Sequence, residues 1–277
     1  MRIIVSLVVL FAFAKANAQD FQGIATYQTQ RHVSFKLDST AAGFSDDIQK
    51  TIQAQMKKQF QREYKLVFNT KESIYKEEEN LDKPDIGALQ SSFQIKFSGN
   101  NDVRYNNTKE SRLTRKSELL GKQFLIKDSL QKPDWKLENE TKTIGRYTCF
   151  KATLTEEIEQ RSLTTINGEE GEEEVKKVER VTTAWYTLDI PVNHGPDRFW
   201  GLPGLIMEIN DGKQVILCAK VVLNPKEKIN IEEPDKGKEV TTEEFSKISL
   251  EKTKELRERY QSNRSGDGNS FEIRIGG

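Results

Sequence analysis

Histidine and cysteine, the side chains that most often carry catalysis or bind transition metals, are scarce in this chain. Its 277 residues include two of each. His32 falls in a strand-like run, and His194 lies in a loop of proline and glycine residues at 191–197. A zinc site needs three or more converging ligands, and no His-Glu-x-x-His or Cys-x-x-Cys spacing is present. The sequence therefore predicts no metal site and no cofactor. His194 is interpreted as a loop residue, with a ligand or base as the alternative.

The signatures of common hydrolases and nucleotide-binding enzymes are also missing. There is no Gly-x-Ser-x-Gly elbow and no glycine-rich loop with phosphate-binding or dinucleotide-type spacing. Residues 263–268 resemble the start of a calcium loop, but Arg274 stands where a glutamate must close the shell. The 43 acidic residues offer many carboxylate pairs, whose separations a sequence does not give. The chain is therefore predicted not to be an enzyme, and a hydrolase using dispersed carboxylates is the third functional hypothesis.

The two cysteines, Cys149 and Cys218, each lie inside a run that reads as a strand. In an oxidising compartment they could form one disulfide between neighbouring strands. Equally, both could be buried free thiols that pack as small hydrophobes. The sequence leaves both alternatives open.

The N-terminus reads as a cleavable secretory signal peptide over residues 1–18. Arg2 supplies positive charge, residues 3–14 are mostly apolar, and Ala16-Asn17-Ala18 has the small-x-small form that signal peptidase requires. The apolar run is shorter than the roughly 20 residues that span a membrane as a helix. We expect residues 19–277 to be a single exported domain without a transmembrane segment. Its place is the periplasm or the outer membrane surface, with secretion as the alternative.

Composition favours a sheet with one face in water. Only 35% of residues are hydrophobic and 31% are charged, too few apolar side chains for a core with apolar faces on every side. Residues 93–97 alternate apolar and polar side chains with the period of a half-buried strand. Comparable runs occur at 23–35, 64–75, 123–127, 147–154, 181–188, 205–209, 215–222 and 271–275. The predicted fold is mainly β with one or two packed helices (α+β), as a large curved antiparallel sheet or half-barrel.

Two segments have helical spacing. Ser45 can cap a helix over residues 45–61 that carries one apolar stripe and should lie on the sheet. Thr241 and Glu244 have the form of a capping box at the start of a charged helix over residues 241–261.

Charge gives one local prediction and one exclusion. Lys and Arg equal Asp and Glu at 43 each, so nothing in the overall charge attracts a polyanion, and nucleic-acid binding is not expected. The acidic run 167–174 is predicted to be a solvated hairpin tip, with calcium binding as the alternative.

The most distinctive segment is Gly201-Leu202-Pro203-Gly204-Leu205-Ile206. This hexapeptide is the signature of the GLPGLI family, and the resemblance extends to blocks at 23–27, 144–152 and 184–199. It covers most of residues 22–222. The resemblance implies an exported protein of Gram-negative bacteria. The family has no established activity, so no catalytic residue is carried over.

The hexapeptide also has a physical interpretation of its own. Pro203 fixes φ and Gly204 accepts a positive φ, so residues 202–205 fit a type II turn that leads into a strand. Such a turn could simply set strand register. Alternatively, the turn and the preceding loop form a recognition surface that presents aromatic side chains to a partner. The loop residues concerned are His194, Gly195, Pro196, Phe199 and Trp200.

Two functional hypotheses precede the hydrolase. The first is a binding or carrier module in which a curved sheet and the 45–61 helix hold a lipid or an extended peptide, by analogy with periplasmic lipoprotein-carrier half-barrels. The second is an accessory or assembly protein that acts beside an outer-membrane system through the surface loop 193–200.

Overall fold

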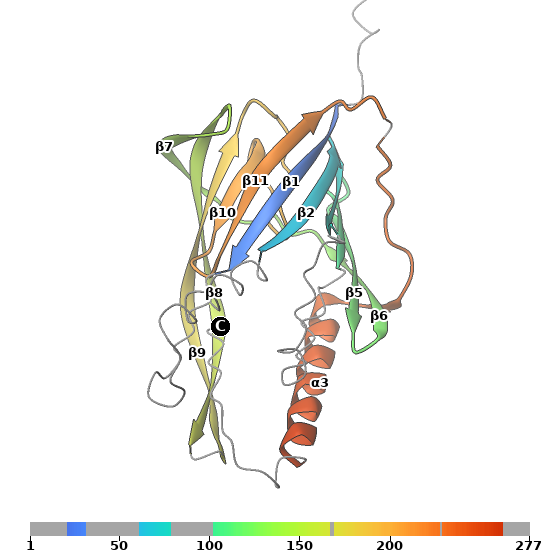
Figure 1. Cartoon of the computed structure of the whole chain (residues 1–277), viewed down its shortest axis with the longest axis vertical. Helices are drawn as coiled ribbons and strands as arrows, with labels where there is room; N and C mark the ends of the chain where they lie inside the picture. Colours follow the sequence, from blue (N-terminus) through green and yellow to red (C-terminus); the bar gives the residue numbers. More distant parts are fainter. Residues whose placement is uncertain (1–20, 32–60, 79–101, 167–168, 228, 263–277) are drawn as a thin grey trace, which may run out of the picture.

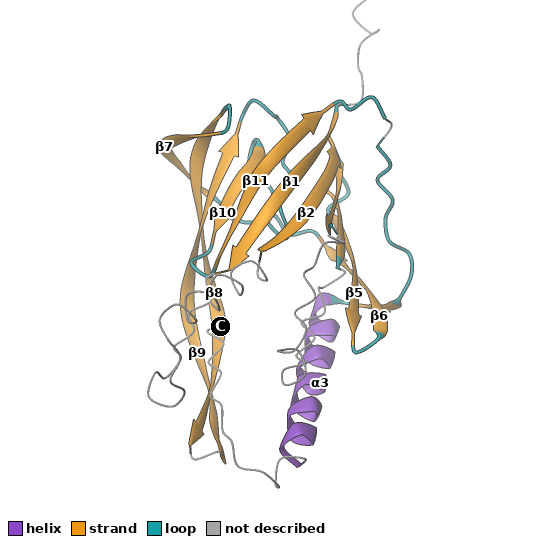
Figure 2. Ribbon diagram, in the orientation of Figure 1, coloured by secondary structure: helices purple, strands orange, loops and turns teal. Residues whose placement is uncertain are grey.

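The computed structural model describes residues 21–31, 61–78, 102–166, 169–227 and 229–262, which are mainly β (Figures 1 and 2). The described strands form one sheet in the order β12-β6-β5-β4-β3-β2-β1-β11-β10-β9-β8-β7. All neighbours are antiparallel except β12 and β6, which run parallel. The strands are β1 (Gln22–Arg31), β2 (Gln61–Asn69), β3 (Glu72–Glu77), β4 (Val103–Asn107), β5 (Arg112–Leu119), β6 (Lys122–Ser129), β7 (Lys136–Ile144), β8 (Tyr147–Ile166), β9 (Glu169–Thr187), β10 (Leu205–Asn210), β11 (Gln214–Leu223) and β12 (Lys238–Val240). The predicted mainly β fold with a large antiparallel sheet is confirmed.

Alternating burial gives the sheet an inner and an outer face. In β1, Ala25 and Tyr27 are fully buried, and the residues between and beside them are partly exposed. Their partners in β2 include the buried Leu66. One core cluster joins these side chains to Ala152 of β8 and Ala184 of β9. Because strands far apart in the sheet share one core, the sheet curves around its inner face, with β12 and β7 as open edges (Figure 1).

Most of the predicted strands are confirmed, and one run proves to be two strands. The runs 123–127, 147–154, 205–209 and 215–222 lie within β6, β8, β10 and β11, and run 181–188 lies in β9 apart from its last residue. Run 23–35 lies in β1 where it is described.

The predicted strand over 64–75 is instead the hairpin of β2 and β3. The Asn69 side chain accepts hydrogen bonds from the backbone N–H groups of Lys71 at 2.7 Å and Glu72 at 2.8 Å, which closes a turn. A local side-chain contact therefore interrupts an apolar pattern that looks continuous.

Strands β4, β5, β7 and β12 were not predicted. Strand β5 reads Arg-Leu-Thr-Arg-Lys-Ser-Glu-Leu, with polar side chains on both faces. Strand β7 has no fully buried residue. Period-two alternation marks only strands with one apolar face, so polar strands escape it.

The strands β8 and β9 extend past their neighbours as a two-stranded ribbon, residues 154–166 and 169–182 (Figure 1). Their pairing continues to Ile166 opposite Glu169. The prediction of an acidic hairpin tip over 167–174 is therefore wrong for residues 169–174, which belong to β9.

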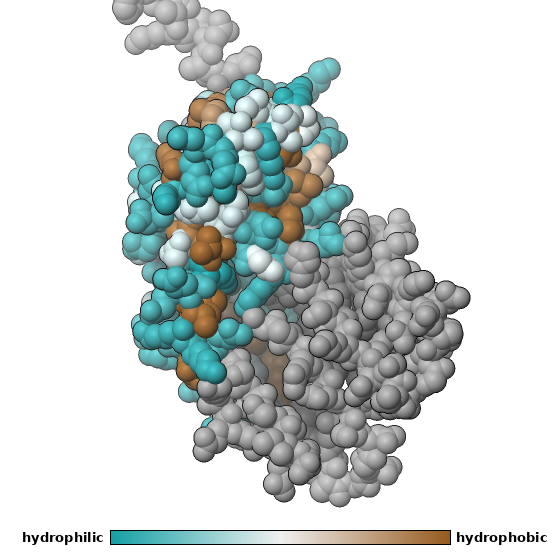
Figure 3. Space-filling model, turned by 90° about the vertical axis from the view of Figure 1, so that its left-hand side faces the viewer, coloured by the Kyte–Doolittle hydropathy of each residue, from teal (hydrophilic) through white to brown (hydrophobic). Residues whose placement is uncertain are grey.

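The side of the molecule that carries the ribbon is mostly hydrophilic, with separate hydrophobic patches (Figure 3). The exposed apolar residues include Val175 and Val181 on the ribbon and Leu137 on β7. Scattered single apolar residues of this kind are normal for a protein surface.

The predicted capping box is confirmed at the start of α3 (Thr242–Ser262). Thr241 Oγ1 accepts from the Glu244 N–H at 3.2 Å, and Glu244 Oε2 accepts from the Thr241 N–H at 2.8 Å. Phe245 and Ile248 pack on the apolar end of β6, so the helix is attached to the sheet mainly by its first turns (Figure 2).

Replacing Thr241 by alanine is expected to destabilise α3 by about 1 kcal/mol, because the Glu244 N–H loses its side-chain acceptor. Hydrogen exchange of the α3 amides should accelerate about fivefold. Thr253→Ala is the control, since the Thr253 hydroxyl only bonds back to Ser249 O at 2.8 Å within the helix. Equal exchange in the two variants would contradict a capping contribution.

Several predictions lie outside the described residues: the signal peptide 1–18, the helix over 45–61 apart from Gln61, which begins β2, and the strands at 93–97 and 271–275. Within the part that is described, no helix is long and apolar enough to cross a membrane.

Candidate functional site

A fifteen-residue segment between β9 and β10, residues 190–204, folds back onto the inner face of the sheet. We call it the plug. Ile190, Val192, Phe199 and Leu202 insert into the core cluster and are at most 3% exposed. The plug is bound at both ends, since Ile190 O accepts the Leu205 N–H at 3.0 Å. Its apolar side chains therefore fill the inner face at this end of the sheet.

The plug does not form the predicted type II turn. That turn requires a positive φ at Gly204, and the glycine with positive φ in this segment is Gly201, at 93°. Gly204 is needed for a different reason: a Cβ there would lie 1.9 Å from the carbonyl oxygen of Thr187. Pro203 is exposed beside these buried neighbours. The hexapeptide is thus a closely packed segment. Gly201 is required for its positive φ, and Gly204 is required because a side chain there would clash with Thr187.

The preceding residues of the plug are packed equally tightly. A Cβ on Gly195 would meet Phe199 O at 2.6 Å and the Ile206 side chain at 2.7 Å. Pro196 is buried, and its carbonyl accepts the Phe199 N–H at 3.1 Å. From β1, Tyr27 donates its hydroxyl to Ile206 O at 2.7 Å. Backbone packing, not side-chain presentation, explains the glycines of this segment.

The alternative interpretation, in which Phe199 and Trp200 are presented to a partner, does not agree with their burial. Phe199 is 1% exposed and Trp200 is 5% exposed. Trp200 packs with Leu113 and donates its indole N–H to Gln131 O at 3.1 Å. The aromatic rings cover apolar surface inside the molecule, so the loop 193–200 offers little of its apolar surface to a second protein.

His194 is a loop residue, as interpreted from the sequence, but its ring is fully buried rather than exposed. Nε2 lies 2.9 Å from Asn69 O, so the neutral ring donates from Nε2 and leaves Nδ1 as an acceptor. Nδ1 has no hydrogen-bond partner among the described residues. Burial lowers the pKa of His194 to about 4, so the ring is neutral at pH 7. The ring links the plug to the end of β2.

Both cysteines are free, buried thiols in this structure. Burial raises the pKa of Cys149 to about 11 and that of Cys218 to about 12. Thiols with such pKa values are almost entirely protonated at pH 7, so they behave as small apolar side chains rather than nucleophiles.

Next to the plug, the side chains on the inner face of the sheet change from apolar to charged. Register places Arg104 of β4 opposite the buried Tyr75 of β3, and Arg180 of β9 lies two residues before the buried Thr182, on the same face. The plug contributes its two charged residues here. We call this group the polar belt, and its members are Arg62, Glu77, Asp102, Arg104, Arg115, Glu156, Arg180, Asp197 and Arg198.

Within the polar belt, Arg198 forms the most complete ion pair. Its two terminal nitrogens donate to the Glu156 carboxylate at 2.8 and 2.6 Å, and its guanidinium lies 4.6 Å from the centre of the Phe199 ring. Arg180 approaches the same carboxylate at 3.4 Å. Hydrogen bonds from Arg198 hold the pKa of Glu156 below its usual range. This pair fastens the plug to the ribbon.

A double-mutant cycle on Arg198→Ala and Glu156→Ala is expected to give a coupling energy of about 1–2 kcal/mol. A bidentate pair is strong, but both side chains are partly exposed and water screens them. The exposed pair Lys177–Glu157 on the ribbon should couple by less than about 0.5 kcal/mol. Similar coupling in both cycles, measured by urea unfolding, would contradict a fastening contribution from Arg198.

Arg104 and Arg115 stand directly opposite each other on β4 and β5. Like charges at opposed positions destabilise a sheet. Arg115 is compensated by Asp102 at 3.4 Å and stacks on Phe245 of α3 at 5.3 Å. No described residue forms an ion pair with Arg104, and its Nε is buried without a partner. Burial lowers the pKa of Arg104.

Asp197 lies at the centre of the polar belt. Its charge interacts with those of Arg104, Arg198 and Asp102. Its backbone is left-handed, with φ at 51°, a conformation that aspartate and asparagine adopt more readily than most residues. Strained residues of this kind cluster at binding sites. The loop conformation therefore places this carboxylate near two arginines, Arg104 and Arg198.

The polar belt is also where carboxylates converge. Burial raises the pKa of Asp102, and the nearby charge of Asp197 raises it further. Asp102 also interacts with the Ser117 hydroxyl, but no described histidine bonds to either carboxylate. In the described part of the chain, no group of three or more His, Cys, Asp or Glu side chains could hold a metal ion. Charge recognition is what this arrangement does best.

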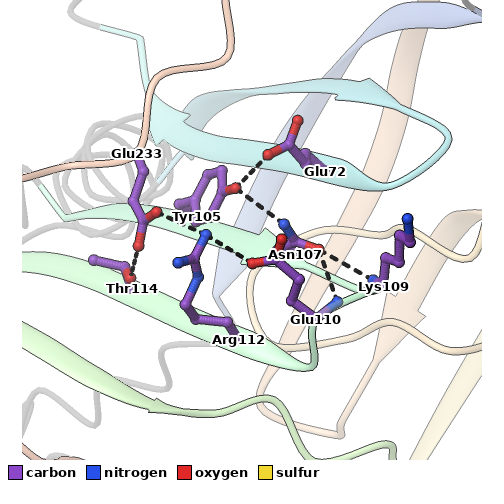
Figure 4. Close-up of polar contacts among 8 residues, drawn as sticks. All are labelled: Glu72, Tyr105, Asn107, Lys109, Glu110, Arg112, Thr114 and Glu233. Atoms are coloured by element: carbon purple, nitrogen blue, oxygen red, sulfur yellow. Dashed lines mark hydrogen bonds and ion pairs between the residues drawn. The ribbon is translucent and has the colours of Figure 1, made fainter.

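A second polar network lies on the outer face and has a structural function (Figure 4). Residues 224–227 and 229–237, which we call the strap, lie along that face between β11 and β12 (Figure 1). Glu233 of the strap accepts from the Thr114 hydroxyl and pairs with Arg112 at 3.0 Å. Tyr105 donates its hydroxyl to Glu72 beside them. Further along, the strap and sheet enclose a shallow pocket of about 220 Å³ over Ile24.

Sequence reasoning selected the plug but not the polar belt. Asp197 and Arg198 are the charged residues within residues 190–204, so a signal was present. No sequence signal marked Arg104 and Arg115, because these residues are brought together only by the register of β4 and β5.

Comparisons with known proteins give a family match over part of the chain. Residues 135–208 match a family described as "Protein of unknown function (Porph_ging)". The matched segment runs from just before β7 into β10, so it contains the ribbon and the whole plug. No curated protein matches the chain. The sequence that is similar to this family thus includes the plug and the Arg198–Glu156 pair, and it excludes β1 to β6.

Solved structures similar to this chain include "Structure of PNGF-II in C2 space group", with 14% identity and a TM-score of 0.47, and "Structure of PNGF-II in P21 space group", with 15% identity and a TM-score of 0.48. Each match covers 83% of this chain and 33% of the other. This chain therefore spans about a third of the length of the proteins it resembles in structure.

Proposed function

We propose that this chain is an exported, non-catalytic binding protein of the bacterial envelope, as its resemblance to the GLPGLI family suggests, and that the polar belt binds its ligand. The supporting observation is the contrast along the inner face. Apolar side chains of the plug fill one end, whereas the charged end includes buried polar atoms of Asp102, Arg104 and Arg180 that lack partners among the described residues. Such atoms cost free energy until a partner satisfies them, and a ligand is one such partner.

The extent and charge of the polar belt define the ligand. Its members lie on or beside β2, β3, β4 and β5, on the plug and on the ribbon, so it suits an extended molecule better than a compact one. Its five arginines exceed its four carboxylates, which favours a ligand with anionic groups. A wholly apolar ligand has less support, because the plug occupies the apolar end. We therefore favour an extended polar ligand, such as a peptide segment, over a lipid.

The proposal is tested on protein expressed with its own signal sequence and purified from the periplasm. Native mass spectrometry should show a retained mass on the wild type. Asp197→Asn should retain more ligand than the wild type, because the variant removes a central negative charge from the polar belt while asparagine accepts the same left-handed backbone. Asp189→Asn, an exposed position at the end of β9, is the control and should retain the ligand.

Two outcomes would count against the proposal. One is an apo mass for every variant, together with nothing above background in organic and aqueous extracts. The other is equal retention by Asp197→Asn and the wild type, which would place binding elsewhere. If the chain is found in the cytoplasm with Met1 retained, the proposed export to the envelope is contradicted.

A further inference from the structure

We propose that Arg104 is the centre of an anion subsite, which binds a carboxylate or phosphate group of the ligand; this inference rests on the proposed function of the polar belt. The first ground is electrostatic. Arg104 faces Arg115 directly across β4 and β5, and the charge of Arg198 acts on it as well. Three guanidinium groups gathered on a partly buried face repel one another unless anions separate them.

The second ground is the unequal compensation of these arginines. Arg198 is held by Glu156 at 2.6 Å, and Arg115 is held by Asp102 at 3.4 Å. Arg104 has no ion pair within 4 Å among the described residues, and its buried Nε has no hydrogen-bond partner. Asp197 acts on Arg104 through its charge without contacting it. Of these three arginines, Arg104 is therefore the one whose guanidinium group remains available to an added anion.

The third ground is the geometry of the neighbours. Arg104 stands opposite Tyr75, whose ring stacks on Tyr64 at 5.0 Å with an interplanar angle of 7°. On the other side, Arg115 is fixed by its stacking on Phe245 and by Asp102. A guanidinium between such rigid neighbours loses little freedom on binding, and its planar fork matches a carboxylate or a phosphate.

The subsite is tested by titrating the full chain with inorganic phosphate and, separately, with acetate, at constant ionic strength maintained with sodium chloride. The Nε–Hε signal of Arg104 should move and saturate with at least one of the two anions. Comparison of the two titrations distinguishes a phosphate from a carboxylate as the preferred group. Arg104→Gln should weaken that binding by about tenfold or more, because a charge-assisted fork is lost.

Arg112→Gln is the matched control, since Arg112 lies outside the polar belt, on the outer face of β5, and already pairs with Glu233 at 3.0 Å. It should bind the anion within about twofold of the wild type. Without anion, Arg104→Gln is expected to melt at a higher temperature than the wild type, because an uncompensated cation has been removed. Arg104→Lys, which keeps the charge but not the fork, should bind with intermediate affinity if the glutamine variant fails to fold.

The inference is overturned if neither anion gives a saturable response, or if Arg104→Gln binds as tightly as the wild type. Its failure is separable from that of the proposed function. If native spectra show a retained ligand but phosphate and acetate leave the Arg104 signal unaffected, the anion subsite is contradicted and the proposed function is not. Saturable anion binding at Arg104 with no retained ligand would support the subsite and contradict the proposed function.

Discussion

Replacing Gly204 by alanine is expected to lower the free energy of unfolding by at least about 3 kcal/mol. The added Cβ would lie 1.9 Å from Thr187 O and 2.6 Å from the carbonyl carbon. Both atoms belong to backbone, so no rotamer change can relieve the contact. The start of β10 must move away from the end of β9, which opens the core where Leu205 and Ile206 are fully buried. Urea unfolding monitored by tryptophan fluorescence measures the loss.

Gly212→Ala separates this packing effect from a general cost of losing glycine. Gly212 lies between β10 and β11 with φ at 81°, and a Cβ there would meet nothing within 4 Å. Its replacement should cost about 1 kcal/mol, because only the left-handed backbone is penalised. If Gly204→Ala unfolds at the same urea concentration as Gly212→Ala, the close approach to Thr187 does not determine the stability of the plug.

The example of Gly204 shows what a sequence can and cannot predict about this segment. The hexapeptide was recognisable, and the strand that follows it was placed correctly. The turn type was wrong because the constraint on Gly204 comes from Thr187, seventeen residues earlier, and not from its neighbours in the chain. Local rules relate a glycine to its own φ, whereas a close approach between two backbones depends on tertiary packing.

Elements whose pattern is local were predicted well. Strand β1 alternates buried and partly exposed residues, and the Thr241–Glu244 box caps α3 as expected. The polar strands β4 and β5 were not predicted, because their inward positions include Arg104 and Arg115 in place of apolar side chains. Those departures from the apolar pattern coincide with the candidate site, as expected where function and not stability selects the residue.

The second large effect concerns pH, and it arises from His194. The ring is fully buried, and its pKa of about 4 lies below the value of about 6.5 that it has when the chain unfolds. Between these values the unfolded state binds a proton that the folded state excludes, so stability is lost as pH falls. The loss should begin near pH 6.5, reach roughly 3 kcal/mol and level off below about pH 4. Above pH 7.5 the residue should contribute no pH dependence.

His194→Gln isolates this contribution, because glutamine can still donate to Asn69 O and does not titrate in this range. The carboxylates of the polar belt titrate in both proteins, so the informative quantity is the difference in unfolding free energy between wild type and variant at each pH. That difference should shift by roughly 3 kcal/mol in favour of the variant between pH 7.5 and pH 4. A constant difference would mean that the folded protein accepts the proton on the ring. The plug would then have to open at that position, since protonated Nδ1 has no acceptor among its described neighbours.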